Sequence, residues 1–186
     1  MIGYAFCGSF CTLGASLSAL RRLRAEGEEI QPILSDMVYG TDTRFYRAAD
    51  FRTEVEAACG RPAIHTIVDA EPLGPRTPLD FLIIAPCTGN TLAKMALGIT
   101  DTPVTMAAKA HLRAERPLLL AIASNDALSA NLPNLTHLLM RKGVYLVPVR
   151  QDDPKKKPSS LIADFERLPD AYHAAREGKQ LRPLFL

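Results

Sequence analysis

The segment LDFLIIAPCTGNTLAKMALG, residues 79–98, decides the fold class of this chain of 186 residues. Its first part, residues 79–85, is almost entirely apolar and has the length of a β-strand. Its second part carries apolar residues such as Leu92 and Met95 at helical spacing and ends at a glycine. A nearly continuous apolar strand is buried on both faces, which is typical of a parallel sheet covered by helices. The segment therefore predicts a buried strand that leads directly into a helix.

The same alternation of strand-like and helix-like segments extends over the rest of the chain. Leu13, Leu17, Leu20 and Leu23 repeat at helical spacing, and Gly27 ends that pattern. Short connections between alternating elements favour a doubly wound parallel α/β sheet in three layers, α/β/α, within a single domain. Further strands are predicted at residues 2–7, 30–34, 118–123 and 144–149, with a short β-like run at 63–68; further helices at 45–58, 132–139 and 161–172; and loops at 69–78 and 151–158.

Composition and charge exclude several function classes. The chain has 22 Lys and Arg against 20 Asp and Glu, and a net charge of +2 gives no reason to expect a nucleic-acid partner. The longest apolar runs have strand length, far below the ~20 residues that span a bilayer. The chain begins on a strand-like segment without an export signal, so we expect a cytoplasmic protein. The four cysteines fit neither a zinc ribbon nor a redox pair, and no metal site is predicted.

Small hydroxyl residues follow four of the five predicted strands. Open parallel sheets bind ligands beyond the carboxyl ends of their strands. Hydroxyls and glycine at helix starts are typical of a phosphate site, whereas each hydroxyl taken alone is better explained as a helix N-cap. The four together favour a ligand site, and no GxGxxG or Walker A sequence accompanies them. The predicted cofactor-binding residues are Gly8, Ser9, Ser35, Pro86, Thr88, Asn90, Thr91 and Ser124.

The stretch APCTGNTLAKMALGITD, residues 85–101, resembles the P-x-S-A-N-T motif of the flavoprotein family. That family includes FMN-dependent cysteine decarboxylases, phosphopantothenoylcysteine decarboxylases and flavin prenyltransferases. Asn90 both donates and accepts hydrogen bonds, which suits the edge of a planar heterocycle. Within the family, the chain resembles the B subunits of dipicolinate synthase along nearly its whole length. The segments that carry this resemblance are residues 35–45, 64–75, 83–113, 124–131 and 151–161.

This resemblance implies a role in making dipicolinic acid, a pyridine dicarboxylate of bacterial spores. It implies oxidation of a dihydrodipicolinate-type precursor in the mother cell, with NADP and the hydride chemistry on a partner A subunit. It also implies a flavodoxin-like domain over residues 1–186, with the C-terminal helix and tail, about 159–186, packing on it. The family commonly forms trimers or larger homo-oligomers. The resemblance leaves open whether this chain binds FMN, because the sequence keeps the residues of a phosphate-binding edge.

The chain departs from the flavin decarboxylases at two places. Their P-A-M-N motif reads Pro103-Val104-Thr105-Met106 here, so that the asparagine that holds their substrate has no counterpart. Thr88-Gly89 replaces their Ser-Ala. Both departures argue against decarboxylation of a cysteine. His65 is the candidate for the catalytic histidine of these enzymes, and a purely structural role is the alternative.

A dicarboxylate substrate calls for Lys or Arg. Lys94 lies four residues after Asn90 and therefore on the same helix face, although a solvated lysine is an equally good interpretation. The predicted substrate-binding residues are Lys94, Thr105, Met106 and Lys109, and further candidate cations are Arg44, Arg113 and residues 155–157.

Three hypotheses about function follow. The first is a synthase subunit that acts with a nicotinamide-binding A subunit. The second is a free-standing FMN-binding flavoprotein with its own redox or decarboxylase activity. The third is a non-catalytic chain that serves as a scaffold for the A subunit.

Overall fold

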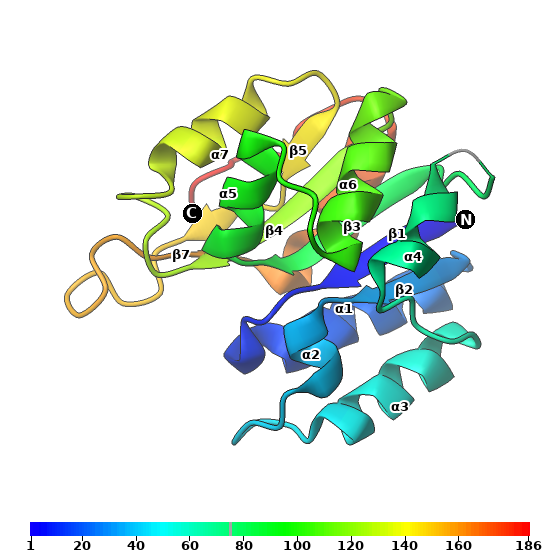
Figure 1. Ribbon diagram of the computed structural model, residues 1–186. Coiled ribbons are helices and arrows are strands. Elements are labelled where there is room, and N and C mark those ends of the chain that lie inside the picture. Colours follow the sequence, from blue (N-terminus) through cyan, green and yellow to red (C-terminus); the bar gives the residue numbers. More distant parts are fainter. Residues whose placement is uncertain (75) are drawn as a thin grey trace.

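Five parallel strands form the main part of the sheet in the computed structural model, which describes residues 1–74 and 76–186 (Figure 1). Their order, β2-β1-β3-β4-β5, is that of flavodoxin-like folds. The prediction of a flavodoxin-like α/β fold is thereby confirmed. The strands are β1 (Ile2–Phe6), β2 (Ile30–Leu34), β3 (Phe81–Cys87), β4 (Leu118–Ser124) and β5 (Val144–Leu146).

An antiparallel edge makes the sheet mixed rather than purely parallel. β7 (Leu161–Ala163) pairs with the end of β4 and with β6 (Val149–Arg150). The prediction of one strand over residues 144–149 was therefore wrong, because Pro148, which has no N–H for a ladder, lies between β5 and β6. The residues predicted to start the last helix, from Leu161, form a strand instead.

Helices cover both faces of the sheet (Figure 1). α1 (Leu13–Ala25) packs against α3 (Ala48–Cys59) and α8 (Leu168–Arg176), whereas α5 (Gly89–Leu97) packs against α6 (Pro103–Arg113) and α7 (Leu132–Leu139). Across the described residues, none of the helices combines the length and the apolarity needed to cross a bilayer. Pro169 lies in the first turn of α8, where a helix tolerates proline, so it starts this helix and does not bend it.

Short helical turns connect the remaining elements. They are the 3-10 turns η1 (Phe10–Thr12), η2 (Glu71–Leu73) and η3 (Phe165–Arg167) and the short helices α2 (Asp36–Gly40) and α4 (Ile67–Ala70). Of the β-like run predicted at residues 63–68, only Ile64 makes a bridge, to Ile33. The loop predicted at 69–78 contains the end of α4 and all of η2, and its Pro75 lies outside the described residues.

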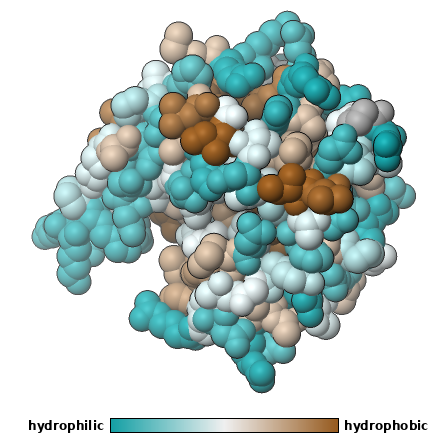
Figure 2. All heavy atoms as spheres, viewed as in Figure 1, coloured by the Kyte–Doolittle hydropathy of each residue, from teal (hydrophilic) through white to brown (hydrophobic). Residues whose placement is uncertain are grey.

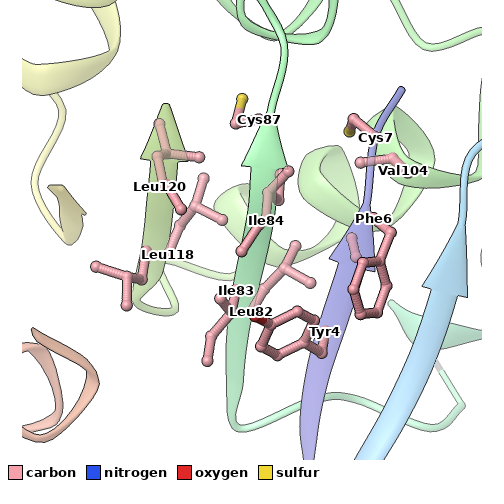
Figure 3. Close-up of a cluster of buried hydrophobic side chains, with 14 of the residues drawn as sticks. Tyr4, Phe6, Cys7, Leu82, Ile83, Ile84, Cys87, Val104, Leu118 and Leu120 are labelled. Carbon is pink, nitrogen blue, oxygen red and sulfur yellow. The ribbon is translucent and has the colours of Figure 1, made fainter. Parts of the chain in front are cut away.

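The core lies on both faces of β1, β3 and β4, as the apolar runs predict (Figure 3). Polar groups inside it are satisfied: the Tyr4 hydroxyl lies 2.9 Å from the Ser16 carbonyl oxygen, and the Ser16 hydroxyl donates to the Ala85 carbonyl at 2.6 Å. Tyr172 of α8 packs edge-on against Phe81 of β3, with ring centroids 5.0 Å apart. These contacts hold α1 and α8 against the sheet, and the parallel pairing of β1 with β3 places the carboxyl ends of the two strands side by side.

Candidate functional site

A cavity of about 410 Å³ opens at the carboxyl ends of β1, β2 and β3, and we call it the carboxyl-end cleft. The structure brings together here five predicted cofactor-binding residues and one predicted substrate-binding residue. The side chains and backbone that line it belong to Cys7, Gly8, Ser35, Asp36, Met37, Thr88, Asn90, Thr91, Lys94 and Thr102.

Two residues whose hydroxyls line the cleft, Ser35 and Thr88, also cap the N-termini of helices α2 and α5. The Ser35 hydroxyl accepts from the Val38 backbone N–H at 3.4 Å, and the Thr88 hydroxyl accepts from the Thr91 N–H at 3.4 Å. Both residues are thus N-caps that line the cleft at the same time. A hydroxyl carries one proton and two lone pairs, so capping does not exhaust its capacity to bind a ligand.

The floor of the cleft is a buried thiol. The Thr91 hydroxyl donates to Cys7 Sγ at 3.3 Å, and burial raises the pKa of Cys7 to about 11. Burial also raises the pKa of Cys87, which ends β3 next to the end of β1 (Figure 3). Since the thiolate is the nucleophilic form, these protonated thiols act at neutral pH as small packing groups.

The lysine that lines the cleft is already paired with a carboxylate. Lys94 Nζ lies 2.8 Å from a carboxylate oxygen of Asp101, and the lysine side chain is 22% exposed. Asp36 faces the same cavity. Because Lys94 is paired with Asp101 and Asp36 adds a second carboxylate, the described residues of the lining offer no free positive charge, and the surface of the cleft suits a ligand that is recognised mainly by hydrogen bonds.

A polar network that the sequence analysis missed supports the start of α5. Asp126 accepts hydrogen bonds from the Ser124 hydroxyl and, at 2.9 Å, from Asn131 Nδ2, and these bonds hold the pKa of its carboxyl below the usual value. A Cβ on Gly89 would lie only 2.6 Å from the Ser124 and Asn131 polar atoms. Gly89 is therefore required for this network. The replacement of Ala by Gly in the motif was the sequence signal that pointed to it.

The structure does not bring the other predicted cofactor-binding residues into the cleft. Ser9 and Ser124 line a separate cavity of about 140 Å³ beside β7, together with Asp152 and Lys157. Pro86 lies buried within β3, where its carbonyl accepts from the Cys7 N–H at 3.2 Å.

His65 and the predicted residues of α6 also lie elsewhere. The His65 ring stacks on Tyr39, with centroids 3.8 Å apart and planes 5° from parallel. Thr105 is buried and forms a capping box with Thr102, with N–H to hydroxyl distances of 3.1 and 3.0 Å. Met106 is partly buried against the core, and Lys109 lies in a groove between α5 and α6.

Comparisons with known proteins identify the family. The model of the Flavoprotein family matches residues 5–162. The B subunit of dipicolinate synthase from Bacillus subtilis (strain 168) is 43% identical over 185 residues, which cover 100% of this chain and 92% of that protein. The crystal structure of the corresponding B subunit from Bacillus halodurans C superimposes with a TM-score of 0.91 at 39% identity, covering 100% of this chain and 95% of that one.

A more distant relative shares the fold. A dodecameric FMN-dependent UbiX-like decarboxylase from Escherichia coli O157:H7 gives a TM-score of 0.65 at 25% identity, covering 79% of this chain and 78% of that one. Decarboxylases and flavin prenyltransferases thus occur among the relatives. The similarity to the B subunits, by contrast, extends over the whole chain. The chain therefore belongs to the Flavoprotein family and, within it, to the family of dipicolinate synthase B subunits.

Proposed function

We propose that this chain is the B subunit of a dipicolinate synthase and acts with a nicotinamide-binding A subunit in the cytoplasm of a sporulating mother cell. The observation that carries the proposal is the 43% identity to a B subunit over the full chain. In the reaction, a dihydrodipicolinate-type precursor loses two electrons and two protons. One hydride passes to NADP⁺ on the A subunit, one proton is released, and the aromatic pyridine dicarboxylate forms.

The carboxyl-end cleft fits an FMN-type ligand. Its volume of about 410 Å³ falls within the range of ligand pockets, ~300–1,000 Å³. The Asn90 amide would bind the polar edge of the flavin ring, and the Ser35 hydroxyl would donate to its phosphate. The Thr88 hydroxyl donates to the Thr91 hydroxyl at 3.1 Å, because Thr91 gives its own proton to Cys7, so Thr88 would offer the ligand only a lone pair. When bound, FMN would supply a two-electron carrier. The buried Cys7 thiol in the lining would help to exclude water from the site.

The cleft suits a dicarboxylate less well than a flavin. Lys94 is bound to Asp101, so a substrate carboxylate would have to displace Asp101 before it could bind this lysine. His65 stacks on Tyr39 beside β2, and we propose that it shapes the cleft wall through Tyr39 of α2.

We further propose that the whole chain acts as one flavoprotein-like domain that assembles into a homo-oligomer, a trimer or a multiple of it. Figure 2 shows hydrophobic side chains gathered over α5 on the helical face, and Leu97 there is 72% exposed. Met140, after α7, is 83% exposed. A dodecameric relative supports assembly into a homo-oligomer.

The first test is an absorbance spectrum of the purified chain, followed by titration with FMN. A flavin band, or saturable FMN binding that Asn90→Asp weakens, supports a working cofactor site. A colourless chain that does not bind FMN removes the cofactor part of the proposal. The second test mixes the chain with an A subunit and measures oxidation of the precursor. Failure of this chain to raise the A subunit's activity would contradict its assignment as a synthase subunit.

The same experiments distinguish the synthase subunit from two alternative functions. A free-standing flavoprotein is favoured by the position of Ser35, Thr88 and Asn90 in one cleft of a single chain, and it would turn over without the A subunit. A scaffold is favoured by the lining of the cleft, whose lysine is already paired with Asp101 and so is not free to bind an acidic substrate. It would raise A-subunit activity equally well with Thr88→Ala and Asn90→Asp, whereas a subunit that takes part in the chemistry would not.

A further inference from the structure

A second cavity lies between α5 and α6, and we call it the α5–α6 groove. Its volume is about 350 Å³, within the ~300–1,000 Å³ of known ligand pockets. Apolar side chains form its walls, and three cationic side chains converge on it from α6 and from the segment after α7. The apolar side chains are Met95, Ile99, Ala108 and Leu112, and the cations are Lys109, Arg113 and Arg141.

Carboxylates do not neutralise these three cations within the described part of the chain. Among residues 1–74 and 76–186, no Asp or Glu lies within ion-pair distance of Lys109, Arg113 or Arg141. Glu115 lines the adjoining cavity with Arg141 but does not reach it. The whole chain carries a net charge of +2, so three such positive charges in one groove form a strong local concentration. Such a concentration attracts anions and is weakened by salt.

The walls of the groove restrict which anion fits. Apolar carbon surface next to charged groups suits a ligand that has both a compact hydrophobic body and acidic groups. Inorganic phosphate would satisfy the cations but would leave the apolar walls in contact with water. A planar ring with two carboxylates satisfies both, because guanidinium groups bind carboxylates through paired hydrogen bonds.

The groove is distinct from the carboxyl-end cleft. Among the described residues, the two cavities share no lining residue. The adjacent residues Lys94 and Met95 line different cavities, the cleft and the groove, and Thr102 lines the cleft whereas Thr105, three residues later, lines the groove. The capping box between Thr102 and Thr105 and the Lys94–Asp101 pair therefore stand between the two cavities.

From these observations we propose that the α5–α6 groove is a second ligand site, which binds a small organic dianion with a compact apolar body. Arg113 and Arg141 hold its acidic groups, Lys109 adds a third positive charge, and Met95 and Leu112 contact its body. This site does not depend on FMN binding in the cleft.

The test is isothermal titration of the full chain with pyridine-2,6-dicarboxylate at low salt, with benzoate and inorganic phosphate as comparison probes. The dicarboxylate should bind more tightly than benzoate, and phosphate should bind most weakly. Arg113→Gln and Arg141→Gln should each weaken binding of the dicarboxylate about tenfold, because each removes a charged hydrogen-bond donor, and Lys109→Gln should weaken it about threefold, because it removes a solvent-screened charge. Arg150→Gln, on the edge strand β6, is the matched control and should leave binding unchanged.

Three outcomes would overturn the proposal. If Lys94→Gln abolishes binding and the groove variants do not, the dianion binds in the cleft. If phosphate binds as tightly as the dicarboxylate, the apolar walls have no role. If the intact protein binds none of the probes at millimolar concentration, the groove is either a solvated surface or covered by a second copy of the chain. None of these results depends on whether FMN binds.

Discussion

The carboxyl-end cleft and the α5–α6 groove share two helices, yet their cations are in opposite states. In the cleft, Lys94 is bound to Asp101 and the polar lining consists mainly of hydroxyls and an amide. In the groove, Arg113 and Arg141 are exposed to a cavity that has apolar walls and, among the described residues, no carboxylate in its lining. Position at the carboxyl ends of the strands therefore does not decide which cavity suits an anion. A cavity suits an anion when its cations are not already paired with carboxylates of the same chain.

The comparison depends on α6, which lines the groove and whose N-cap, Thr102, lines the cleft. This helix is held at His111. His111 is buried, and its Nε2 lies 2.7 Å from the Pro117 carbonyl oxygen, so the neutral ring donates there. Burial lowers the pKa of His111 to about 4. The unfolded chain binds a proton below pH ~6.5, whereas the folded chain does so only near pH 4. We expect the free energy of unfolding to fall by up to about 3 kcal/mol as the pH falls from 6.5 to 4.

Urea unfolding at pH 7 and at pH 4.5 measures this loss. His111→Gln keeps an N–H donor and should flatten the pH dependence, whereas His137→Gln, on the exposed side of α7, should not. If the wild type and the His111→Gln variant lose the same free energy over this range, His111 does not couple α6 to pH.

Gly89→Ala tests the hydrogen-bonded network of Ser124, Asp126 and Asn131 at the start of α5. The added Cβ would lie 2.6 Å from Ser124 Oγ and Asn131 Nδ2, so the hydrogen bonds to Asp126 would have to shift. We expect a loss of about 1–3 kcal/mol in stability, as for other overpacked sites. Weaker FMN binding should accompany this loss, with unchanged binding in the groove. Calorimetry should show a lower Tm for Gly89→Ala, whereas Gly40→Ala, whose Cβ would meet nothing within 4 Å, should leave the Tm unchanged or raise it.

Local patterns in the sequence predicted the fold and part of the cleft. The apolar run of β3 and the hydroxyls at Ser35 and Thr88 were found because strand ends and helix caps are properties of short segments. Ser9 and Ser124 were expected in the same place. Pairing of β4 with β7 instead leaves them beside a smaller cavity, and that pairing is not visible in any one segment.

The groove was predictable only in part. Thr105, Lys109 and Arg113 were candidates for binding a dicarboxylate and do line it, whereas its apolar walls and Arg141 were not foreseen. Met95, Lys109 and Arg141 come from three separate segments, and no motif links them. The ion pair between Lys94 and Asp101 was not predictable either. Asp101 lies seven residues after Lys94 and contacts it only because the chain turns back after Gly98.

Asn90→Asp tests whether hydrogen bonds dominate recognition in the cleft. Asn90 is exposed, so the change should leave stability within about 0.5 kcal/mol. A carboxylate cannot donate to the flavin edge and repels its phosphate, so we expect FMN affinity to fall about tenfold, or ~1.4 kcal/mol. Fluorescence quenching of FMN measures the affinity, with Asn125→Asp beside the smaller cavity as the control. Equal affinity in wild type and Asn90→Asp would show that the amide does not contact the ring.

Asp101→Asn should make the cleft resemble the groove, and it gives the smallest expected effect. The pair it breaks joins a 22% exposed lysine to a 53% exposed aspartate, and such pairs contribute less than ~1 kcal/mol to stability. The released Lys94 adds a positive charge to the cleft, so the affinity for FMN should rise about two- to fivefold at low salt and return to the wild-type value at high salt. Glu54→Gln breaks the exposed Arg21–Glu54 pair between α1 and α3 and should change neither affinity nor its salt dependence. A fall in affinity in Asp101→Asn would mean that Asp101 positions Lys94 for the ligand. The paired lysine would then be part of the binding site, and the contrast between the two cavities would lie in their shape and not in their charge.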